Sequence, residues 1–322
     1  MLLSILLFAV GLVLLIKGGD WFVDGATGIA RRFHLPDIVV GATVVSIGTT
    51  LPEVMVSATG AMLGQGAMAY GNAIGSIICN TALIAAISVA VNPGPVNTKS
   101  MKMPVLFFFV SAAIYCVAAY LMGEFTRPLG VIMLTIFVVY LIFTVRQGMK
   151  NPEEVEEEEE ANAKPRTFLQ DLFWLVVGAG LIAVGADLLV EHGTIIAVGL
   201  GVPETVIALT FVALGTSLPE LVTTITSLRK GHASLGIGNV IGANVFNLVL
   251  VSGVAVTLAP FEVPVGNLIF GHNASLVMDI PIMLTVMLLL TMPALATKKL
   301  HRWQGVVLLC IYAAFCICQF AM

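Results

Sequence analysis

Ten apolar stretches, each long enough to cross the hydrocarbon core of a membrane, recur along the 322 residues of the chain. A helix needs about 20 mostly apolar residues to span about 30 Å of hydrocarbon. The composition agrees, because only 11% of the residues are charged, against about 25% in a typical soluble domain. The expected spans are residues 2–30, 35–64, 67–91, 103–122, 128–147, 168–197, 203–229, 234–258, 277–294 and 303–321. We therefore expect an all-α polytopic membrane protein.

The first stretch has no basic region before it and no small-residue cleavage site after it, so it is expected to be a span and not a removed signal peptide. All five cysteines fall in expected spans, without a spacing typical of a metal site or a disulfide framework, and packing roles are expected for them. They are Cys79, Cys116, Cys310, Cys316 and Cys318.

Positive charge is distributed unevenly among the loops. Thirteen of the fifteen Lys and Arg residues fall in or beside alternate loops, whereas Lys17 lies within the first span and Arg127 lies in the opposite set. Cytoplasmic loops carry an excess of Lys and Arg. The thirteen residues are Arg31, Arg32, Lys99, Lys102, Arg146, Lys150, Lys164, Arg166, Arg229, Lys230, Lys298, Lys299 and Arg302. This pattern predicts that both termini are outside and that residues 149–166 are cytoplasmic.

The chain matches itself at an offset of 167 residues without a gap, and 23 of the 66 positions from 18 to 83 are identical. Apolar bias inflates such a count, but it does not align rare residue types in one register. Five of these matches are Asp20 with Asp187, Pro36 with Pro203, Glu53 with Glu220, Gly71 with Gly238, and Asn80 with Asn247. The sequence therefore contains an internal repeat.

Each repeat holds five expected spans, and because five is odd, the second repeat enters the membrane from the opposite side. The expected fold is ten transmembrane helices arranged as two inverted five-helix repeats, residues 1–148 and 167–322, joined by an acidic linker, residues 149–166. Inverted repeats with discontinuous helices are typical of secondary transporters, whose sites lie near the bilayer midplane. The linker is too rich in glutamate to form a packed core, and a solvated segment is expected.

The second and seventh spans carry the related motifs SIGTTLPE (46–53) and ALGTSLPE (213–220). Pro52 has no N–H to donate to the carbonyl of Gly48, and Pro219 has the same relation to Gly215, so helices 2 and 7 are expected to be kinked or broken there. Glu53 follows Thr49 by one turn and therefore shares its face; Glu220 and Thr216 repeat this pattern. A carboxylate at this depth usually marks an ion or proton pathway.

The third and eighth spans carry GNAIGSIICN (71–80) and GNVIGANVFN (238–247). Asn72, Ser76 and Asn80 recur every four residues and so line one side of a helix. The glycines permit close approach of a neighbouring helix. The four motif segments together offer carboxylate, hydroxyl, amide and backbone oxygens without His or Cys, a donor set that suits Ca²⁺ or Na⁺ and disfavours zinc, copper or iron. Two carboxylates balance one divalent cation, and they could instead hold Na⁺ ions or protons.

A proline or a GxxxG pattern alone would be explained by kinking or packing, but the whole constellation occurs twice in register. It resembles the two α-repeats of the sodium/calcium exchanger family, within the cation/calcium antiporter superfamily. The resemblance rests on GTTLPE and GTSLPE, each followed by GNxIG and by an Asn 27 residues after the Glu. It covers residues 36–90 and 203–257 by motif and nearly the whole chain by architecture.

The resemblance implies one site that favours Ca²⁺ and three that favour Na⁺. The implied Ca²⁺ ligands are Glu53, Glu220, Thr49 and Thr216. One flanking Na⁺ site is expected from Ser46, Thr49, Ser76 and Glu53, and the other from Ala213, Thr216, position 243 and Glu220, with Asn80 and Asn247 completing the middle. The helix breaks are expected at Pro52, Pro219, Gly48 and Gly215.

Two departures from the family pattern bear on function. Position 243 is Ala where its repeat mate is Ser76, so one sodium site is expected to lose a ligand. Asn247 is an amide where potassium-dependent relatives tend to carry Asp, and the GN motifs lack the acid of proton-coupled relatives. The resemblance therefore favours potassium-independent, electrogenic Na⁺/Ca²⁺ exchange by alternating access, with Ca²⁺/H⁺ exchange as the alternative.

Two other classes of function fit less well. A cation channel would not explain inverted repeats, and a hydrolase would need a nucleophile with its base, or a metal-bound water, which no motif supplies. We expect no cofactor apart from the transported ions, no nucleic-acid partner and no obligatory protein partner, so the protein is expected to be a monomer in the lipid bilayer. The short linker indicates a prokaryotic plasma-membrane protein, because animal exchangers carry a large regulatory domain there.

Overall fold

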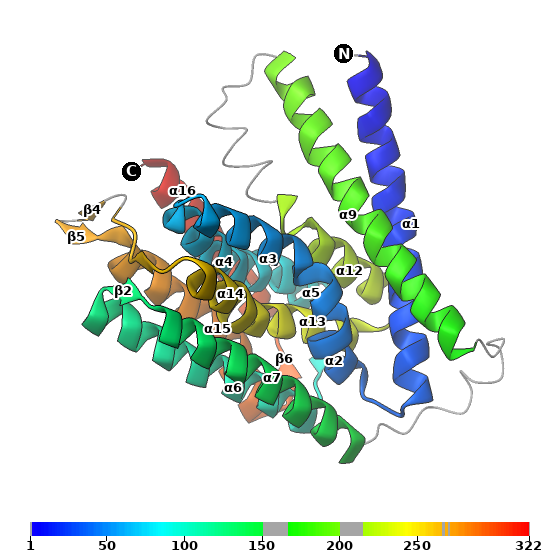
Figure 1. Ribbon diagram of the computed structural model, residues 1–322. Helices are drawn as coiled ribbons and strands as arrows, with labels where there is room; N and C mark the ends of the chain where they lie inside the picture. The colour runs from blue at the N-terminus through cyan, green and yellow to red at the C-terminus, as the bar shows by residue number, and fades with distance from the viewer. Residues whose placement is uncertain (1, 151–166, 200–214, 266–267, 270, 322) are drawn as a thin grey trace.

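The computed structural model describes residues 2–150, 167–199, 215–265, 268–269 and 271–321, and it is dominated by long helices (Figure 1). Within these residues, nine helical segments are long and apolar enough to cross a membrane. They are Leu2–Arg32, Asp37–Met62, Gly66–Val91, Thr98–Met122, Arg127–Met149, Phe168–Gly193, Ala233–Leu258, Ser275–Thr297 and Arg302–Gln319. Nine of the ten expected spans are thus present, each with ends within a few residues of the expected ones.

The tenth expected span, 203–229, is described only from residue 215 onward, where the helix α12 (Leu218–Arg229) forms its second half. The expected linker also lies almost wholly outside the described residues, although α7 (Arg127–Lys150) continues two residues into its expected start. The division into two repeats with a linker between them therefore stays a prediction.

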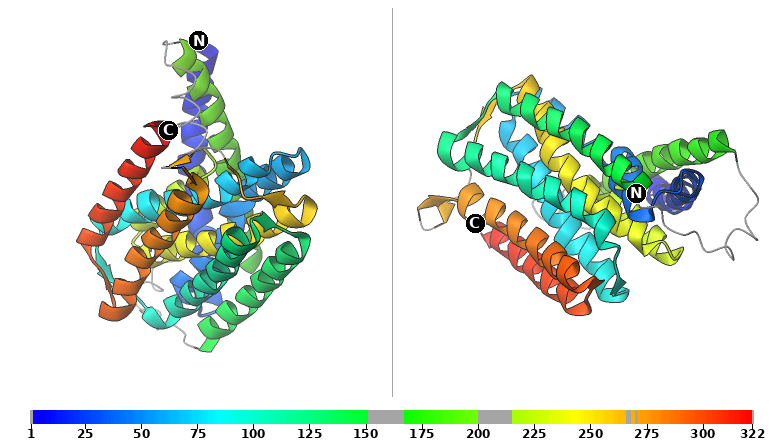
Figure 2. Two further views of the ribbon diagram at one scale, coloured as in Figure 1. Left: turned by 90° about the vertical axis from the view of Figure 1, so that its left-hand side faces the viewer. Right: turned by 90° about the horizontal axis from the view of Figure 1, so that it is seen from below.

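Helices α1 (Leu2–Arg32) and α9 (Phe168–Gly199) lie side by side and stand at one side of the other helices (Figures 1 and 2). They run antiparallel, since Gly11 lies opposite Gly185 and Gly18 opposite Gly178. The glycines recur every seven residues, at 11, 18 and 25 on α1 and at 178 and 185 on α9. A Cβ atom on Gly178 would lie 2.5 Å from the backbone nitrogen of Phe22. The seam between α1 and α9 is therefore a contact of backbone with backbone, typical of small residues between membrane helices.

The motif-bearing helices form the centre of the molecule. Asp37–Met62 comprises α2 (Asp37–Val40), the π-helical η1 (Gly41–Val45) and α3 (Ser46–Met62), and Gly66–Val91 comprises α4 (Gly66–Cys79), the π-helical η2 (Asn80–Ala85) and α5 (Ala86–Val91). Ala233–Leu258 comprises α13 (Ala233–Phe246), the π-helical η5 (Asn247–Val251) and α14 (Ser252–Leu258). In these three segments 61–83% of the most apolar window is buried, against 17–44% in the other candidate spans. They are thus more deeply buried in the protein than the other candidate spans are.

The remaining helices surround this centre on the side away from α1 and α9 (Figure 2). They are α6 (Thr98–Val117) with the π-helical η3 (Ala118–Met122), α7, the π-helical η6 (Ser275–Asp279) with α15 (Ile280–Thr297), and α16 (Arg302–Ala321). Short antiparallel strand pairs connect the loops: β1 (Gly94–Pro95) with β6 (Lys299–Leu300), β2 (Glu124–Phe125) with β3 (Phe261–Glu262), and β4 (Leu268–Ile269) with β5 (His272–Asn273). No larger sheet occurs in the described part of the chain.

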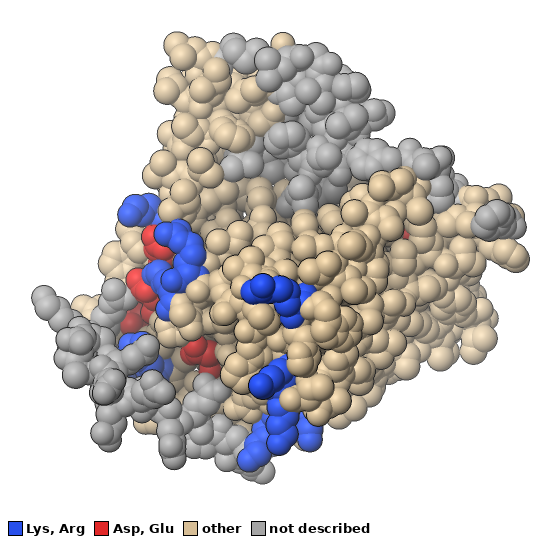
Figure 3. All heavy atoms as spheres, turned by 180° about the vertical axis from the view of Figure 1, so that it is seen from behind, with Lys and Arg blue, Asp and Glu red and all other residues tan. Residues whose placement is uncertain are grey.

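Large apolar side chains are exposed along the outer helices, as expected for a surface that meets lipid. Charged side chains on the face shown in Figure 3 gather on its left and lower parts. An ion pair joins α1 to the end of α12: Lys230 Nζ lies 2.6 Å from Asp24 Oδ1 and donates to the backbone oxygen of Asp20 at 2.8 Å. Another is the contact of His232 Nδ1 with Asp37 Oδ2 at 2.7 Å. Lys230, His232 and Asp37 thus lie at helix ends, whereas Asp20 and Asp24 lie within the second half of α1.

The expected break in the second span differs from what the structure shows. The helix α3 is continuous from Ser46 to Met62 and contains Pro52, so its backbone is not unwound between Gly48 and Pro52. Proline removes only one backbone hydrogen bond, and a helix held on several sides by protein can keep its course despite this loss. The irregular turn lies just before the motif, in η1.

In the seventh span the described residues show a helix start at the expected place. Thr216 and Ser217 form a turn, α12 begins at Leu218, and Pro219 lies in its first turn, where a missing N–H costs nothing. Gly215 is described immediately before this turn. Because residues 200–214 are not described, whether a first half-helix precedes the turn stays a prediction.

Candidate ion-binding site

The two predicted carboxylates are buried in the centre of the molecule. Glu53 on α3 and Glu220 on α12 are each 0% exposed, and no oxygen of either carboxylate has a hydrogen-bond partner in the described part of the chain. The two side chains are also close enough for their charges to repel each other. Burying an unpaired carboxylate is costly, and burying two together costs more. This arrangement calls for positive charge between them.

The threonine of the first motif lies where the sequence predicts. The Thr49 hydroxyl, one turn before Glu53, donates to Asn239 Oδ1 at 3.2 Å and also approaches the Glu220 carboxylate. Thr49 thus connects α3 with both α12 and α13. Thr216 lies in the turn before α12 and lines the same cavity as Thr49.

Two further hydroxyls belong to this region and were not predicted. Thr50 and Ser217 are almost fully buried, and each hydroxyl oxygen lacks a hydrogen-bond partner among the described residues. The repeat could have revealed them, because they are equivalent positions that directly follow the two predicted threonines. Each precedes its glutamate by three residues, so the two add buried neutral oxygens to the segments that carry the carboxylates.

The two predicted asparagines occupy equivalent places at helix irregularities. Asn80 begins η2 and Asn247 begins η5, and both are 0% exposed. Neither their amide nitrogens nor their amide oxygens have a partner in the described structure. The packing is crossed, since η2 contacts α12 and η5 contacts α3. Each asparagine therefore lies beside the helix that carries the other repeat's glutamate.

The two predicted serines lie at different helix interfaces. Ser46 is buried against α13, where its hydroxyl lies 3.0 Å from the backbone oxygen of Asn239. Ser76 is buried on α4, and Cys79, three residues further along, approaches Ser217 next to α12. The predicted grouping of both serines around one ion is not tested by these contacts. Ala213 lies outside the described residues, and Ala243 is fully buried on α13.

The amides of the GN motifs help to hold this centre together. Asn72 donates to Ser57 Oγ at 2.8 Å and to the backbone oxygen of Glu53 at 3.1 Å, which joins α4 to α3 beside the carboxylate. Asn239, its repeat mate, instead accepts from Thr49. A Cβ atom on Gly238 or Gly242 would collide with the backbone of Ile38 or Ala42, respectively. The glycines of the second motif therefore permit close packing. At Gly71 and Gly75 of the first motif, where the sequence also predicts close approach, a Cβ atom would meet nothing within 4 Å in the described structure.

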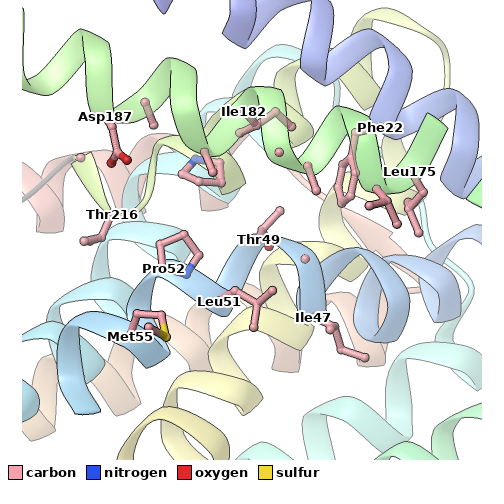
Figure 4. Close-up of a pocket in the computed structure, with 18 of the residues that line it drawn as sticks. Phe22, Ile47, Thr49, Leu51, Pro52, Met55, Leu175, Ile182, Asp187 and Thr216 are labelled. Carbon is pink, nitrogen blue, oxygen red and sulfur yellow. The ribbon is translucent and has the colours of Figure 1, made fainter. Parts of the chain in front are cut away.

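A cavity of about 860 Å³ lies between α3 and α9, next to this group of residues. Its walls are mostly apolar, including Phe22, Leu51 and Met55, and Thr49 and Thr216 supply polar atoms (Figure 4). Asp187 on α9 lines the same cavity. The cavity is lined by residues of both α9 and the motif helices, so a shift of α9 would change access to the threonines.

The donor set has the character of a site for hard cations. In the described residues no group of three or more His, Cys, Asp or Glu side chains gathers in one place. Glu53 and Glu220 instead stand among hydroxyl and amide oxygens, the ligands that Ca²⁺ and Na⁺ prefer. The residues present therefore fit a transported alkali or alkaline-earth ion.

Comparison with known proteins agrees with this chemistry. The profile of the family described as "Sodium/calcium exchanger protein" matches residues 3–146 and 171–321. A membrane protein of Methanocaldococcus jannaschii is 34% identical over 314 residues, with 97% of this chain and 96% of that protein covered. The sodium/calcium exchanger MaX1 of Methanosarcina acetivorans is 29% identical, with 98% of each chain covered.

A solved structure is similar over the same length. The sodium-calcium exchanger NCX_Mj, soaked with 2.5 mM Na⁺ and 0.1 mM Sr²⁺, matches this chain with a TM-score of 0.82 at 31% identity, and the match covers 97% of each chain. The similarity therefore includes the arrangement of the helices as well as the motifs.

Proposed function

This chain belongs to the sodium/calcium exchanger family, and on that premise we propose that it is a secondary active antiporter that exchanges Na⁺ for Ca²⁺ across the membrane. Proteins of this family are cation/calcium antiporters and not enzymes. The finer assignment concerns the identity of the coupled ion, the residues that bind it and the charge moved per cycle.

One observation carries the proposal: the buried, unpartnered pair Glu53 and Glu220. Two carboxylates neutralise one Ca²⁺, and Na⁺ ions can neutralise the same pair in its place. Occupancy by either ion removes the cost of burying the charge, whereas simultaneous occupancy is opposed by repulsion between the cations. Mutually exclusive occupancy of one site is what obligatory exchange requires.

We assign Ca²⁺ to Glu53, Glu220, Thr49 and Thr216, and Na⁺ to the surrounding oxygens, with Asn80 and Asn247 in the middle. Support comes from the burial of both glutamates and both asparagines and from the absence of partners for their polar atoms among the described residues. Asn247 is an amide, which adds no negative charge for a potassium ion. The proposed exchange is therefore independent of potassium.

Alternating access is assigned to movement of α1 and α9 across the site. The two helices are equivalent in the repeat, pack against each other along the glycine seam, and lie at one side of the central helices. Their antiparallel course supports two inverted repeats, because equivalent spans of such repeats cross the membrane in opposite directions. The turn before α12 supports a broken seventh helix.

The orientation follows from the positive-inside rule, with both termini outside and the linker cytoplasmic. In this orientation the contact of Lys230 with Asp24 lies on the cytoplasmic side, near the end of α1. Exchange of three Na⁺ for one Ca²⁺ moves one net charge per cycle. At about 2.3 kcal/mol per charge per 100 mV, the membrane potential then contributes to the direction of transport.

The decisive experiment measures Ca²⁺ uptake into sodium-loaded proteoliposomes. We expect uptake by the wild-type protein, loss of uptake in Glu53→Gln and Glu220→Gln, and no loss in Glu124→Gln, which changes an exposed glutamate in the loop before α7 in the same way. An imposed potassium-diffusion potential should change the rate. Exchange that survives in both buried-site variants would refute the site assignment.

The alternative of Ca²⁺/H⁺ exchange rests on the same carboxylates, because protonation also removes their charge. It predicts uptake driven by a pH gradient in vesicles without sodium. A channel would instead give flux that neither saturates nor depends on an ion on the opposite side. Saturable uptake that requires internal sodium excludes both.

A further inference from the structure

The serine hydroxyls of the two repeats are distributed reciprocally. Position 46 is Ser and its repeat mate 213 is Ala, whereas position 76 is Ser and its repeat mate 243 is Ala. If both serines served the same flank of the site, as the resemblance implies, that flank would carry both of these serine hydroxyls and the other flank neither. The contacts of Ser46 indicate a different arrangement.

Ser46 directs its hydroxyl onto the turn of α13 that ends at Ala243. Its Oγ lies 3.0 Å from the backbone oxygen of Asn239 and 2.8 Å from that of Gly41. A Cβ atom on Gly242 would collide with this same Oγ atom. The side chain of Ser46 therefore occupies the surface of α13 beside position 243.

A serine in a helix commonly donates its hydroxyl to the backbone oxygen four residues earlier. For a serine at position 243 that acceptor would be the oxygen of Asn239, the atom that Ser46 contacts. The Ser46 hydroxyl thus stands close to where the hydroxyl of a serine at 243 would stand. One hydroxyl reaches the same place from the opposite helix.

The atoms around this hydroxyl are oxygens. Asn239 Oδ1 lies 3.3 Å from Ser46 Oγ and 3.2 Å from Thr49 Oγ1, and the carbonyls of Gly41 and Asn239 complete the group. The polar side chains in this set, Ser46, Thr49 and Asn239, are almost fully buried. A hard cation is bound by oxygen ligands of this kind, and Thr49, a member of this set, also approaches the Glu220 carboxylate.

We propose that Ser46 supplies, from α3, the sodium-binding hydroxyl that is missing at Ala243, so that Ser46 serves the α13 side of the site and Ser76, on α4, serves the other side. The inference rests on the proposed exchange function and revises its expected sodium sites. Ala243 then causes no loss of a ligand, because the ligand has moved across the interface between α3 and α13.

A rescue experiment tests this inference in proteoliposomes, with the sodium concentration for half-maximal Ca²⁺ exchange as the readout. Ser46→Ala should raise that concentration about tenfold, the loss expected when one hydrogen-bonding group to a charge is removed. Adding Ala243→Ser to Ser46→Ala should bring it back to within about twofold of wild type. Ser111→Ala, which changes a fully buried serine on α6 away from the site, should have no effect.

A purely structural role of Ser46 gives different results. If Ser46 only supported the structure, Ser46→Ala would change the calcium concentration for half-maximal transport, measured without sodium, as much as the sodium concentration. A serine at 243 would then not restore either value. Should Ser46→Ala fail to fold, Ser46→Cys keeps the volume and replaces the oxygen by sulfur, a poor sodium ligand, and the same tenfold rise is expected.

The inference is overturned if either variant keeps the wild-type sodium dependence, or if Ala243→Ser restores nothing in a folded double variant. These outcomes differ from failure of the proposed function itself. In that case the wild-type protein shows no sodium dependence at all, and the assignment of Ser46 falls with it.

Discussion

The glycine seam between α1 and α9 makes a quantitative prediction about Gly178. A Cβ atom there would lie 2.5 Å and 2.7 Å from the backbone N and Cα of Phe22, and 2.8 Å from the oxygen of Gly18. Ordinary contacts begin at 3.4 Å, so Gly178→Ala requires the two backbones to separate by about 0.6–0.9 Å. Overpacking of this kind costs about 1–3 kcal/mol.

Gly180 is the matched control. It lies on the same helix two residues further along, and a Cβ atom there meets nothing within 4 Å in the described structure. Both substitutions gain the same helix propensity, about 1 kcal/mol, so that gain cancels in the comparison. We therefore expect Gly178→Ala to have a free energy of unfolding about 1–3 kcal/mol below that of Gly180→Ala.

Thermal unfolding of the purified protein, followed by tryptophan fluorescence, is a suitable assay. Trp21 on α1 and Trp174 on α9 lie across the seam with ring centroids 4.7 Å apart, so their emission reports directly on its opening. Equal unfolding midpoints for the two variants, or a higher midpoint for Gly178→Ala, would refute the backbone contact. A lower midpoint for Gly178→Ala, with the tryptophan emission of its folded state unchanged from wild type, would place the damage outside the seam.

Three further predictions concern the centre and the helix ends. Tyr140→Phe removes a buried hydrogen bond of 2.7 Å to the backbone oxygen of Ala42 in η1 and should lower the free energy of unfolding by about 1 kcal/mol; an unchanged unfolding midpoint would contradict it. Glu53→Gln should raise the unfolding midpoint in sodium-free buffer that contains a chelator, because it removes one of two mutually repelling buried charges. It should also reduce the stabilisation that Ca²⁺ gives, which is about 2.7 kcal/mol when the Ca²⁺ concentration is 100 times the Kd. A Ca²⁺-induced shift as large as that of wild type would contradict this assignment. Lys230→Gln should lower the free energy of unfolding by less than about 1 kcal/mol, because the Lys230 and Asp24 side chains are 27% and 38% exposed. The difference from wild type should shrink in 1 M salt. A larger loss of stability that salt does not change would contradict this prediction.

The spans could be predicted from sequence because each depends on a local property, the length of an apolar run. The start of α9 at Phe168 and the ends of Gly66–Val91 agree with the expected bounds within a residue. The motif carboxylates could be predicted because their burial follows from their position inside such runs. Glu53 and Glu220 are indeed both fully buried.

Features that depend on contacts between helices could not be predicted in the same way. Proline at 52 indicates a break when its helix is considered alone, but α3 packs against neighbouring helices on the face that carries Glu53 and stays continuous. The family resemblance assigns Ser46 and Ser76 to one flank of the site, yet only the packing shows that Ser46 faces α13. Thr50 and Ser217 could have been found by comparing the two repeats at the residue that follows each motif threonine, because both repeats carry a hydroxyl there.

The π-helical segments η2 and η5 have a consequence for the phase of the helices that contain them. A π-turn inserts one residue into an α-helix, and such insertions are frequent at functional sites. A single helical wheel drawn through Gly66–Val91 is therefore out of phase beyond Asn80 by about one residue, or roughly 100° of rotation. The same offset begins at Asn247. Each helix can thus present amides to the ion before the π-helical segment and an apolar face to its neighbours after it. The helix need not bend away from the site to do so.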